Sequence, residues 1–124
     1  MSQDSNPLSA STPWNLVADG YAETTMHWLG EYADEAIIAS RLKPGALILD
    51  VACGPGSLAL KLAGKAESVH GIDFSPAMLD IFRQSVARKQ LENIFIQHGD
   101  GQALPYAAGK FDAAFSMFGL MFFP

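Results

Sequence analysis

The sequence of 124 residues contains one cysteine, Cys53. An internal disulfide is therefore impossible, and the cytoplasm is the expected location. The N-terminus lacks the basic start and apolar stretch of a secretory signal. No stretch approaches the roughly 20 apolar residues that cross a bilayer, so we expect no membrane span.

Positive charge is missing from the first third of the chain. Arg41 is the first Lys or Arg, whereas six acidic residues precede it, and the formal net charge is −5. After Arg41 the two signs nearly balance, without the basic stripe that neutralises phosphates. We therefore expect no nucleic-acid partner, and a small-molecule substrate fits better.

Cysteine and histidine form no recognisable reactive or metal-binding group. Cys53 has no base partner in the sequence, so it is expected to be a small buried turn residue. His27, His70 and His98 lack the spacing of metal ligands. No metal site is predicted.

The chain length supports one domain with one core. Residues 1–13 are rich in Ser, Thr, Pro and Asn and are predicted to be a mobile arm. Apolar residues at steps of three and four predict an N-terminal helical cap over residues 14–44, with breaks at Gly20 and Gly30. Residues 45–124 are predicted to be the N-terminal part of a cofactor-binding Rossmann-like domain.

Four apolar strands alternate with helices in this second part. The strands are expected at residues 46–51, 68–72, 94–97 and 111–117, and the helices at 57–63, closed by Gly64, and from Pro76 to about Gln90, capped by Ser75. This alternation predicts an α/β fold with an open parallel sheet and helices on both faces. Right-handed crossovers place the strands in the order 3-2-1-4, with the switch point between strands one and four.

Strand four would lie at an edge of this sheet, yet residues 111–123 are apolar enough for a central strand. The chain is therefore expected to lack the C-terminal strands of a full domain. A long apolar edge invites pairing. We expect a second copy of the chain, or another partner, to cover it.

Acidic residues follow the predicted strands at the rim where ligands bind in open α/β sheets. Asp50 precedes a turn in which Gly54 and Gly56 allow a ligand to approach the backbone closely. Asp73 ends strand two, about 20 residues beyond the turn, as in dinucleotide-binding folds. Its two oxygens could accept hydrogen bonds from both hydroxyls of a ribose.

Other residues of this rim suit a base. Phe74 and Met78 could sandwich its faces, since aromatic and polarizable side chains stack on π systems. Asp100 and the amides of Gly101 and Gln102 could bind its edge. The rim therefore predicts a nucleoside-like ligand.

Three segments together resemble class I S-adenosylmethionine-dependent methyltransferases. The segment 50–56 (Asp-Val-Ala-Cys-Gly-Pro-Gly) resembles their first motif, and 71–79 (Gly-Ile-Asp-Phe-Ser-Pro-Ala-Met-Leu) their second. Residues 99–106, followed by Phe111 and Asp112, resemble their loop and fourth strand. The similarity is greatest to small-molecule enzymes such as those of ubiquinone and menaquinone biosynthesis.

The resemblance implies S-adenosylmethionine as cofactor and methyl transfer to an unidentified small molecule. The turn 50–56 would hold the methionine part, Met117 would lie near it or near the methyl group, and Asp73 and the other rim residues would hold the adenosine. Ala52 stands where the pattern has a glycine, which is tolerable if its φ is negative. No catalytic residue is implied. Because much of the acceptor pocket lies beyond these motifs, this chain is expected to bind cofactor weakly or not at all and to show little turnover.

Two alternatives remain. The segment 54–59 satisfies the relaxed GxGxxA fingerprint of NAD or flavin oxidoreductases, with Asp73 downstream. Against this interpretation stand Asp50 before the turn, the preceding helical segment and the loop at 99–106. The second alternative is a non-catalytic interaction or regulatory module, whose apolar flank is reserved for a partner.

Overall fold

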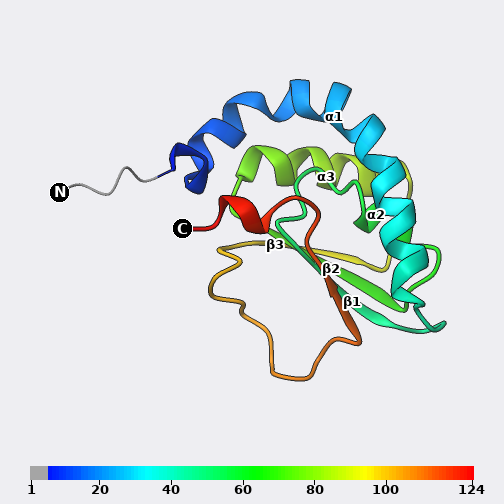
Figure 1. The fold of residues 1–124 in the computed structure, drawn as a ribbon. Helices are drawn as coiled ribbons and strands as arrows, with labels where there is room; N and C mark the ends of the chain where they lie inside the picture. The colour runs from blue at the N-terminus through cyan, green and yellow to red at the C-terminus, as the bar shows by residue number, and fades with distance from the viewer. Residues whose placement is uncertain (1–5) are drawn as a thin grey trace.

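The structure, a computed structural model, describes residues 6–124 (Figure 1). Its helical elements are η1 (Pro7–Ser9), α1 (Ser11–Ser40), α2 (Ala59–Leu62), α3 (Pro76–Arg88) and η2 (Leu120–Phe122). Its strands are β1 (Leu47–Val51), β2 (Ser68–Asp73), β3 (Ile94–His98) and β4 (Ala113–Phe115).

The four strands form one parallel sheet in the order β3-β2-β1-β4, which confirms the predicted topology. In this register Asp50 of β1 lies between Gly71 of β2 and Phe115 of β4. The gap between the carboxyl ends of β1 and β4 is therefore the switch point, where ligands of such sheets bind.

The α-helices α1, α2 and α3 cover one face of the sheet, and the described residues place no α-helix on the other face, where the sequence predicted one (Figure 1). On the helix-covered face α1, α2 and α3 bury one apolar cluster, with Ala33, Ile37, Ile48, Leu58, Leu62, Val69, Leu79 and Phe82 among its members. On the other face, a smaller cluster is covered by the loop before β4 and by the C-terminal segment. This connection contains three glycines and Pro105 within residues 99–112, which disfavour a helix.

Helix α1 is continuous from Ser11 to Ser40, so the predicted breaks at Gly20 and Gly30 do not occur. Glycine inside a helix costs about 1 kcal/mol relative to alanine, which weakens the helix but does not end it. Tertiary packing of Ala33 and Ile37 in the core offsets it.

The N-terminal boundary also differs from the prediction. Within the segment expected to be a mobile arm, Pro7–Ser9 forms a 3-10 helix and α1 has begun by Ser11. Residues 1–5 lie outside the described residues. The division into a cap and a cofactor-binding part remains a prediction.

Element ends differ in three further places. Helix α2 begins at Ala59 because the backbone from Gly54 to Leu58 is still turning, and Gly64 does not adopt the left-handed conformation of a helix C-cap. Strand β4 is limited to Ala113–Phe115. The predicted cap of α3 is confirmed, since the Ser75 hydroxyl accepts a hydrogen bond from the backbone N–H of Met78.

Among the described residues, no helix is both long and apolar enough to cross a membrane. The same residues contain no group of three or more His, Cys, Asp or Glu side chains that could hold a metal ion.

Candidate functional site

A cavity of about 280 Å³ lies at the carboxyl edge of the sheet, between β1, β2, α1 and the C-terminal segment. We refer to it as the large cavity. Nine of the eleven predicted cofactor-binding residues line it: Ala52, Gly54, Asp73, Phe74, Met78, Asp100, Gly101, Gln102 and Met117. Residues from four separate parts of the chain therefore meet around one space of small-ligand size.

The two remaining predicted residues lie elsewhere. Asp50 lines a neighbouring cavity of about 30 Å³, which we call the small cavity. Gly56 lines neither cavity, and a Cβ on it would overlap the ring of Phe82 in α3. Its φ of +94° also favours glycine. The close approach that Gly56 permits is thus made by Phe82, which packs α3 against the turn.

The Asp73 carboxylate is held by two backbone donors. The N–H of Gly54 donates to Oδ2 and the N–H of Ser75 donates to Oδ1, both at 2.9 Å. Burial raises the pKa of Asp73, while these N–H groups act in the opposite direction. Each oxygen keeps a lone pair for a further donor, so Asp73 can accept bonds from a diol in a fixed orientation.

Asp50 is almost fully buried, with 2% of its surface exposed, and its Oδ1 atom has no hydrogen-bond partner. Burial, with the nearby charge of Asp73, raises its pKa to about 8. A buried carboxylate without a counter-charge is costly. The small cavity beside it has room for a water molecule or a small polar group.

Ala52 departs from the expectation of a negative φ. Its φ is +56°, in the left-handed region that glycine adopts most easily. The turn therefore keeps the geometry of a glycine-containing motif although the residue carries a methyl group. Strain of this kind is found at ligand sites when the surrounding structure holds the residue in place.

Asp100 shapes its own loop. Its Oδ1 accepts a hydrogen bond from the N–H of Gln102 at 2.8 Å, and the backbone N–H of Ala103 donates to its carbonyl. The Oδ1 atom of Asp100 thus stabilises the turn formed by residues 100–103, and Asp100, Gly101 and Gln102 of this turn line the large cavity.

The roof of the large cavity was not predicted from the sequence. It is formed by residues of α1 and its N-terminal flank, together with the C-terminal segment: Ser9, Trp14, Tyr21, Thr25, Leu29, Phe118, Gly119, Phe122, Phe123 and Pro124. The steps between Trp14, Tyr21, Thr25 and Leu29 place these residues on one helix face. This periodicity was visible in the sequence but does not say what the face covers.

The two ends of the described chain meet in this roof. The Ser9 hydroxyl donates to the carbonyl of Phe122 at 2.8 Å. The rings of Trp14 and Phe122 make an edge contact with their centroids 5.0 Å apart. The C-terminal segment is therefore fixed to the start of α1.

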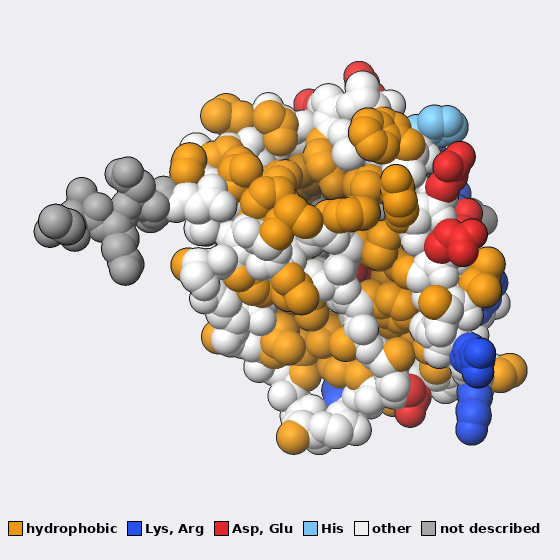
Figure 2. All heavy atoms as spheres, in the orientation of Figure 1, with side chains coloured by type: hydrophobic (Ala, Val, Ile, Leu, Met, Phe, Trp, Pro, Cys, Tyr) orange, Lys and Arg blue, Asp and Glu red, His pale blue; other side chains and the backbone are white. Residues whose placement is uncertain are grey.

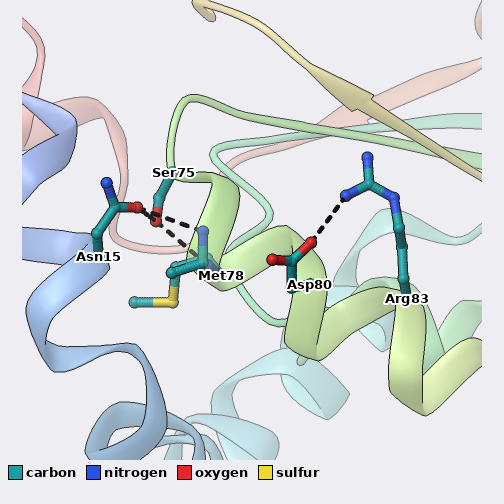
Figure 3. A network of polar contacts seen from close by, with 6 residues as sticks. Asn15, Ser75, Met78, Asp80 and Arg83 are labelled. Carbon is teal, nitrogen blue, oxygen red and sulfur yellow. Dashed lines mark hydrogen bonds and ion pairs between the residues drawn. The ribbon is translucent and has the colours of Figure 1, made fainter.

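A second polar link holds α1 over the site (Figure 3). The Asn15 Oδ1 atom accepts hydrogen bonds from the Ser75 hydroxyl at 2.6 Å and from the Ala77 N–H at 3.3 Å. Ser75 lies two residues after Asp73, at the start of α3. The contact thus joins α1 to the segment that carries the buried carboxylate.

No basic side chain lines either cavity in the part of the chain that the structure describes. Figure 2 shows hydrophobic side chains across the face that holds α1 and the C-terminal segment, with charged side chains gathered at its edge. The site therefore combines Asp50 and Asp73 with apolar walls and no counter-cation. Such a site favours a cationic ligand, whose positive charge would in turn favour the ionised form of Asp50.

The amides of both glycines in the turn are already used within the protein. The Gly54 N–H donates to Asp73, and the Gly56 N–H donates to the Cys53 carbonyl at 3.1 Å. A pyrophosphate needs free N–H donors at such a turn. With acidic and no basic side chains nearby, this geometry disfavours an NAD or flavin pyrophosphate.

Fold and site together define a Rossmann-like α/β protein with an acidic cavity of small-ligand size at its switch point. The family model described as "Methyltransferase domain" matches residues 48–124, and the chain belongs to this family.

Known proteins agree with this membership. A demethylmenaquinone methyltransferase of Halalkalibacterium halodurans is 38% identical over 82 residues, which are 64% of this chain and 34% of that protein. The chain thus spans about a third of the length of this relative.

Solved structures share the fold. A Methanococcus maripaludis protein, provisionally described as an S-adenosyl-L-methionine-dependent methyltransferase, matches with a TM-score of 0.76 and 23% identity, over 100% of this chain and 57% of its own. Coclaurine N-methyltransferase, solved with N-methylheliamine and S-adenosylhomocysteine, matches with a TM-score of 0.62 and 22% identity, over 69% and 26%. These matches give no support to the oxidoreductase or the interaction-module interpretation.

Proposed function

We propose that this chain forms the cofactor-binding part of a methyltransferase that uses S-adenosylmethionine and a small-molecule acceptor. The observation that carries the proposal is the pair of buried aspartic acids, Asp50 and Asp73, which line two adjoining cavities without a basic residue. S-adenosylmethionine has a diol, an aromatic base, a sulfonium and an ammonium group. These groups match the acceptors, the apolar walls and the uncompensated acids of the site.

The residues have separate roles in this proposal. Asp73 binds the ribose hydroxyls in the large cavity, where Phe74 and Met78 contact the base. Asp100, Gly101 and Gln102 bind the edge of the base. Asp50 and the turn with Ala52 and Gly54 hold the methionine part, and Met117, which lines both cavities, lies close to its sulfur.

The cofactor supplies a methyl group already activated by the sulfonium. The protein then contributes binding, alignment and exclusion of water, and oriented binding alone can lower a barrier by roughly 7–11 kcal/mol. No side chain of this site needs to act as a catalytic base. Demethylmenaquinone is the first acceptor to test, because the relatives are named for it.

Binding can be tested by titrating the isotope-labelled 124-residue chain with S-adenosylhomocysteine, followed by amide NMR shifts. This method detects weak complexes, as expected for a chain that spans about a third of its relative's length. We expect shifts concentrated at Gly54, Asp73, Phe74 and Gly101, and none of similar size with NAD. Of the two outcomes that the sequence allows, weak binding or none, the proposal requires weak binding. Shifts with NAD alone, or none at millimolar S-adenosylhomocysteine, would therefore contradict it.

A further inference from the structure

Ala52, in the turn after β1, lies against Gly119, which directly precedes η2. A Cβ added to Gly119 would lie 2.6 Å from the Ala52 Cβ and 2.9 Å from the Ser116 Oγ. Carbon atoms in good contact are about 3.5–4.0 Å apart. Residue 119 therefore cannot carry a side chain while residue 52 carries its methyl group.

The alanine has a backbone conformation that favours glycine, whereas the glycine has one that any residue can adopt. Ala52 has a φ of +56°, which favours glycine. Gly119 has φ −95° and ψ −41°, which any residue adopts. The glycine at position 119 is thus required by the space that the Ala52 methyl and the Ser116 hydroxyl occupy, and not by its own backbone. The Ser116 Oγ can turn away by rotation of its side chain, whereas the Ala52 Cβ is fixed to the backbone.

This contact lies where the two cavities meet. Ala52, Tyr21, Leu29, Gly54 and Met117 line both the large and the small cavity. Ala52 therefore lies on the border between the cavity that contains Asp73 and the one that contains Asp50.

We propose that Ala52 and Gly119 form a steric pair that sets the width of the passage between the two cavities. The absence of a side chain at Gly119 leaves room for the Ala52 methyl beside the C-terminal segment. A methyl group at position 119 would press Ala52 toward the passage. For ligand binding the inference rests on the proposed function, in which the cofactor's amino-acid end passes from the large cavity into the small one.

Three variants and a control test the pair: Ala52→Gly, Gly119→Ala, the double variant, and Gly64→Ala. Gly64 is the matched control because a Cβ there meets nothing within 4 Å and its φ is not positive. All four proteins differ from the wild type by methyl groups alone.

Thermal unfolding tests the steric part without any ligand. Gly119→Ala should lower the midpoint by about 5 °C or more, or prevent folding, because overpacking strains a filled site. Ala52→Gly should raise the midpoint, and the double variant should recover at least most of the loss. If Gly119→Ala is as harmful in the Ala52→Gly background as in the wild type, or is harmless in both, the pair does not exist.

Two ligands test the passage. Adenosine needs the large cavity alone, whereas S-adenosylhomocysteine also carries the amino-acid end. Gly119→Ala should weaken S-adenosylhomocysteine binding at least tenfold and adenosine binding less than threefold, and the double variant should restore both. Equal losses for the two ligands would overturn the role of the pair in the passage.

The two measurements separate the inference from the proposed function. If the wild type binds neither ligand, the proposed function fails, while the unfolding midpoints still decide whether the steric pair exists. If the wild type binds both ligands and the midpoints show no coupling, the steric pair fails alone.

Discussion

The backbone N–H of Gly54 donates to the carboxylate of Asp73 at 2.9 Å, across the ends of β1 and β2. This bond joins the glycine turn to the acid that is proposed to bind the ribose. The same carboxylate accepts from Ser75 at the start of α3. The acid therefore positions the turn and the start of α3, and in the proposed function it would also position the ligand.

Replacing Asp73 with Asn should weaken S-adenosylhomocysteine binding about 10- to 100-fold. The reason is that hydrogen bonds to a charged group contribute about 1.5–3 kcal/mol, and an amide offers only one acceptor oxygen. NMR or calorimetric titration measures the change. Asp80→Asn is the control, since Asp80 is exposed in α3 and pairs only with Arg83 at 3.4 Å (Figure 3). Unchanged affinity in Asp73→Asn would exclude the ribose role.

Asp50 should make the stability of the protein depend on pH. An unfolded Asp ionises near pH 3.9, whereas the buried Asp50 has a pKa of about 8. Between these values the unfolded chain has lost the proton that the folded protein retains. The free energy of unfolding should therefore fall as the pH rises from about 4 to 8, by up to about 1.4 kcal/mol per pH unit, and then level off.

The Asp50→Asn variant isolates this contribution because its amide does not titrate. The variant should gain stability relative to the wild type as the pH rises from 5 to 8, as measured by urea unfolding at several pH values. The pKa of Asp73 is also raised, so its titration acts in the same direction in both proteins. Parallel pH profiles would show that Asp50 ionises normally in the fold.

Asn15→Ala should destabilise the protein by about 1–3 kcal/mol, because the Ser75 hydroxyl and the Ala77 N–H would lose their shared acceptor. Asn15→Asp is the matched control. It keeps an acceptor oxygen and places a negative charge near the N-terminus of α3, where it is favourable. Chemical unfolding gives both values, and an equal loss in the two variants would argue against the hydrogen bonds.

Gly56→Ala should destabilise the protein by about 3 kcal/mol or more. The added methyl would overlap the Phe82 ring, which is completely buried, and the φ of +94° is unfavourable for alanine. Urea unfolding measures the loss, with Gly64→Ala as the variant that meets no neighbour. A fully stable Gly56→Ala protein would mean that Phe82 has another position available.

The strands, their order in the sheet and the cap of α3 could be predicted from the sequence, because each depends on a local pattern of residues. Short apolar runs ending in Asp50 and Asp73 gave two of the four strands, and the right-handed crossover rule gave their order. The cap at Ser75 followed from its position before Pro76. These features are determined by residues close together in the sequence, so the sequence alone is enough to predict them.

Contacts between distant segments could not be predicted in this way. The roof of the large cavity depends on Trp14 meeting Phe122, which are far apart in sequence. Ala52 has a positive φ, and its methyl group lies beside Gly119, a residue 67 positions away in the sequence. Gly56 fits a ligand-binding motif in the sequence, whereas its neighbour in space is Phe82.

We expect a dimer or larger assembly to form at the outer edge of β4. Strand β4 pairs with β1 on one side and has no strand on its other side among the described residues. Part of the apolar segment predicted to need a partner is covered within the chain, since Phe111 and Phe123 pack on the sheet. Leu120 and Met121 remain more than half exposed.

We therefore expect association through η2 and the β4 edge, because unpaired strand groups and adjacent apolar side chains both favour it. Sedimentation velocity at micromolar concentration should show an assembly larger than one chain. The double variant Leu120→Ser and Met121→Ser should shift it toward the monomer, whereas Leu16→Ser, in the exposed part of α1, should not. A wild type that sediments as a monomer would show that packing of Phe111 and Phe123 within the chain is sufficient to prevent association through this edge.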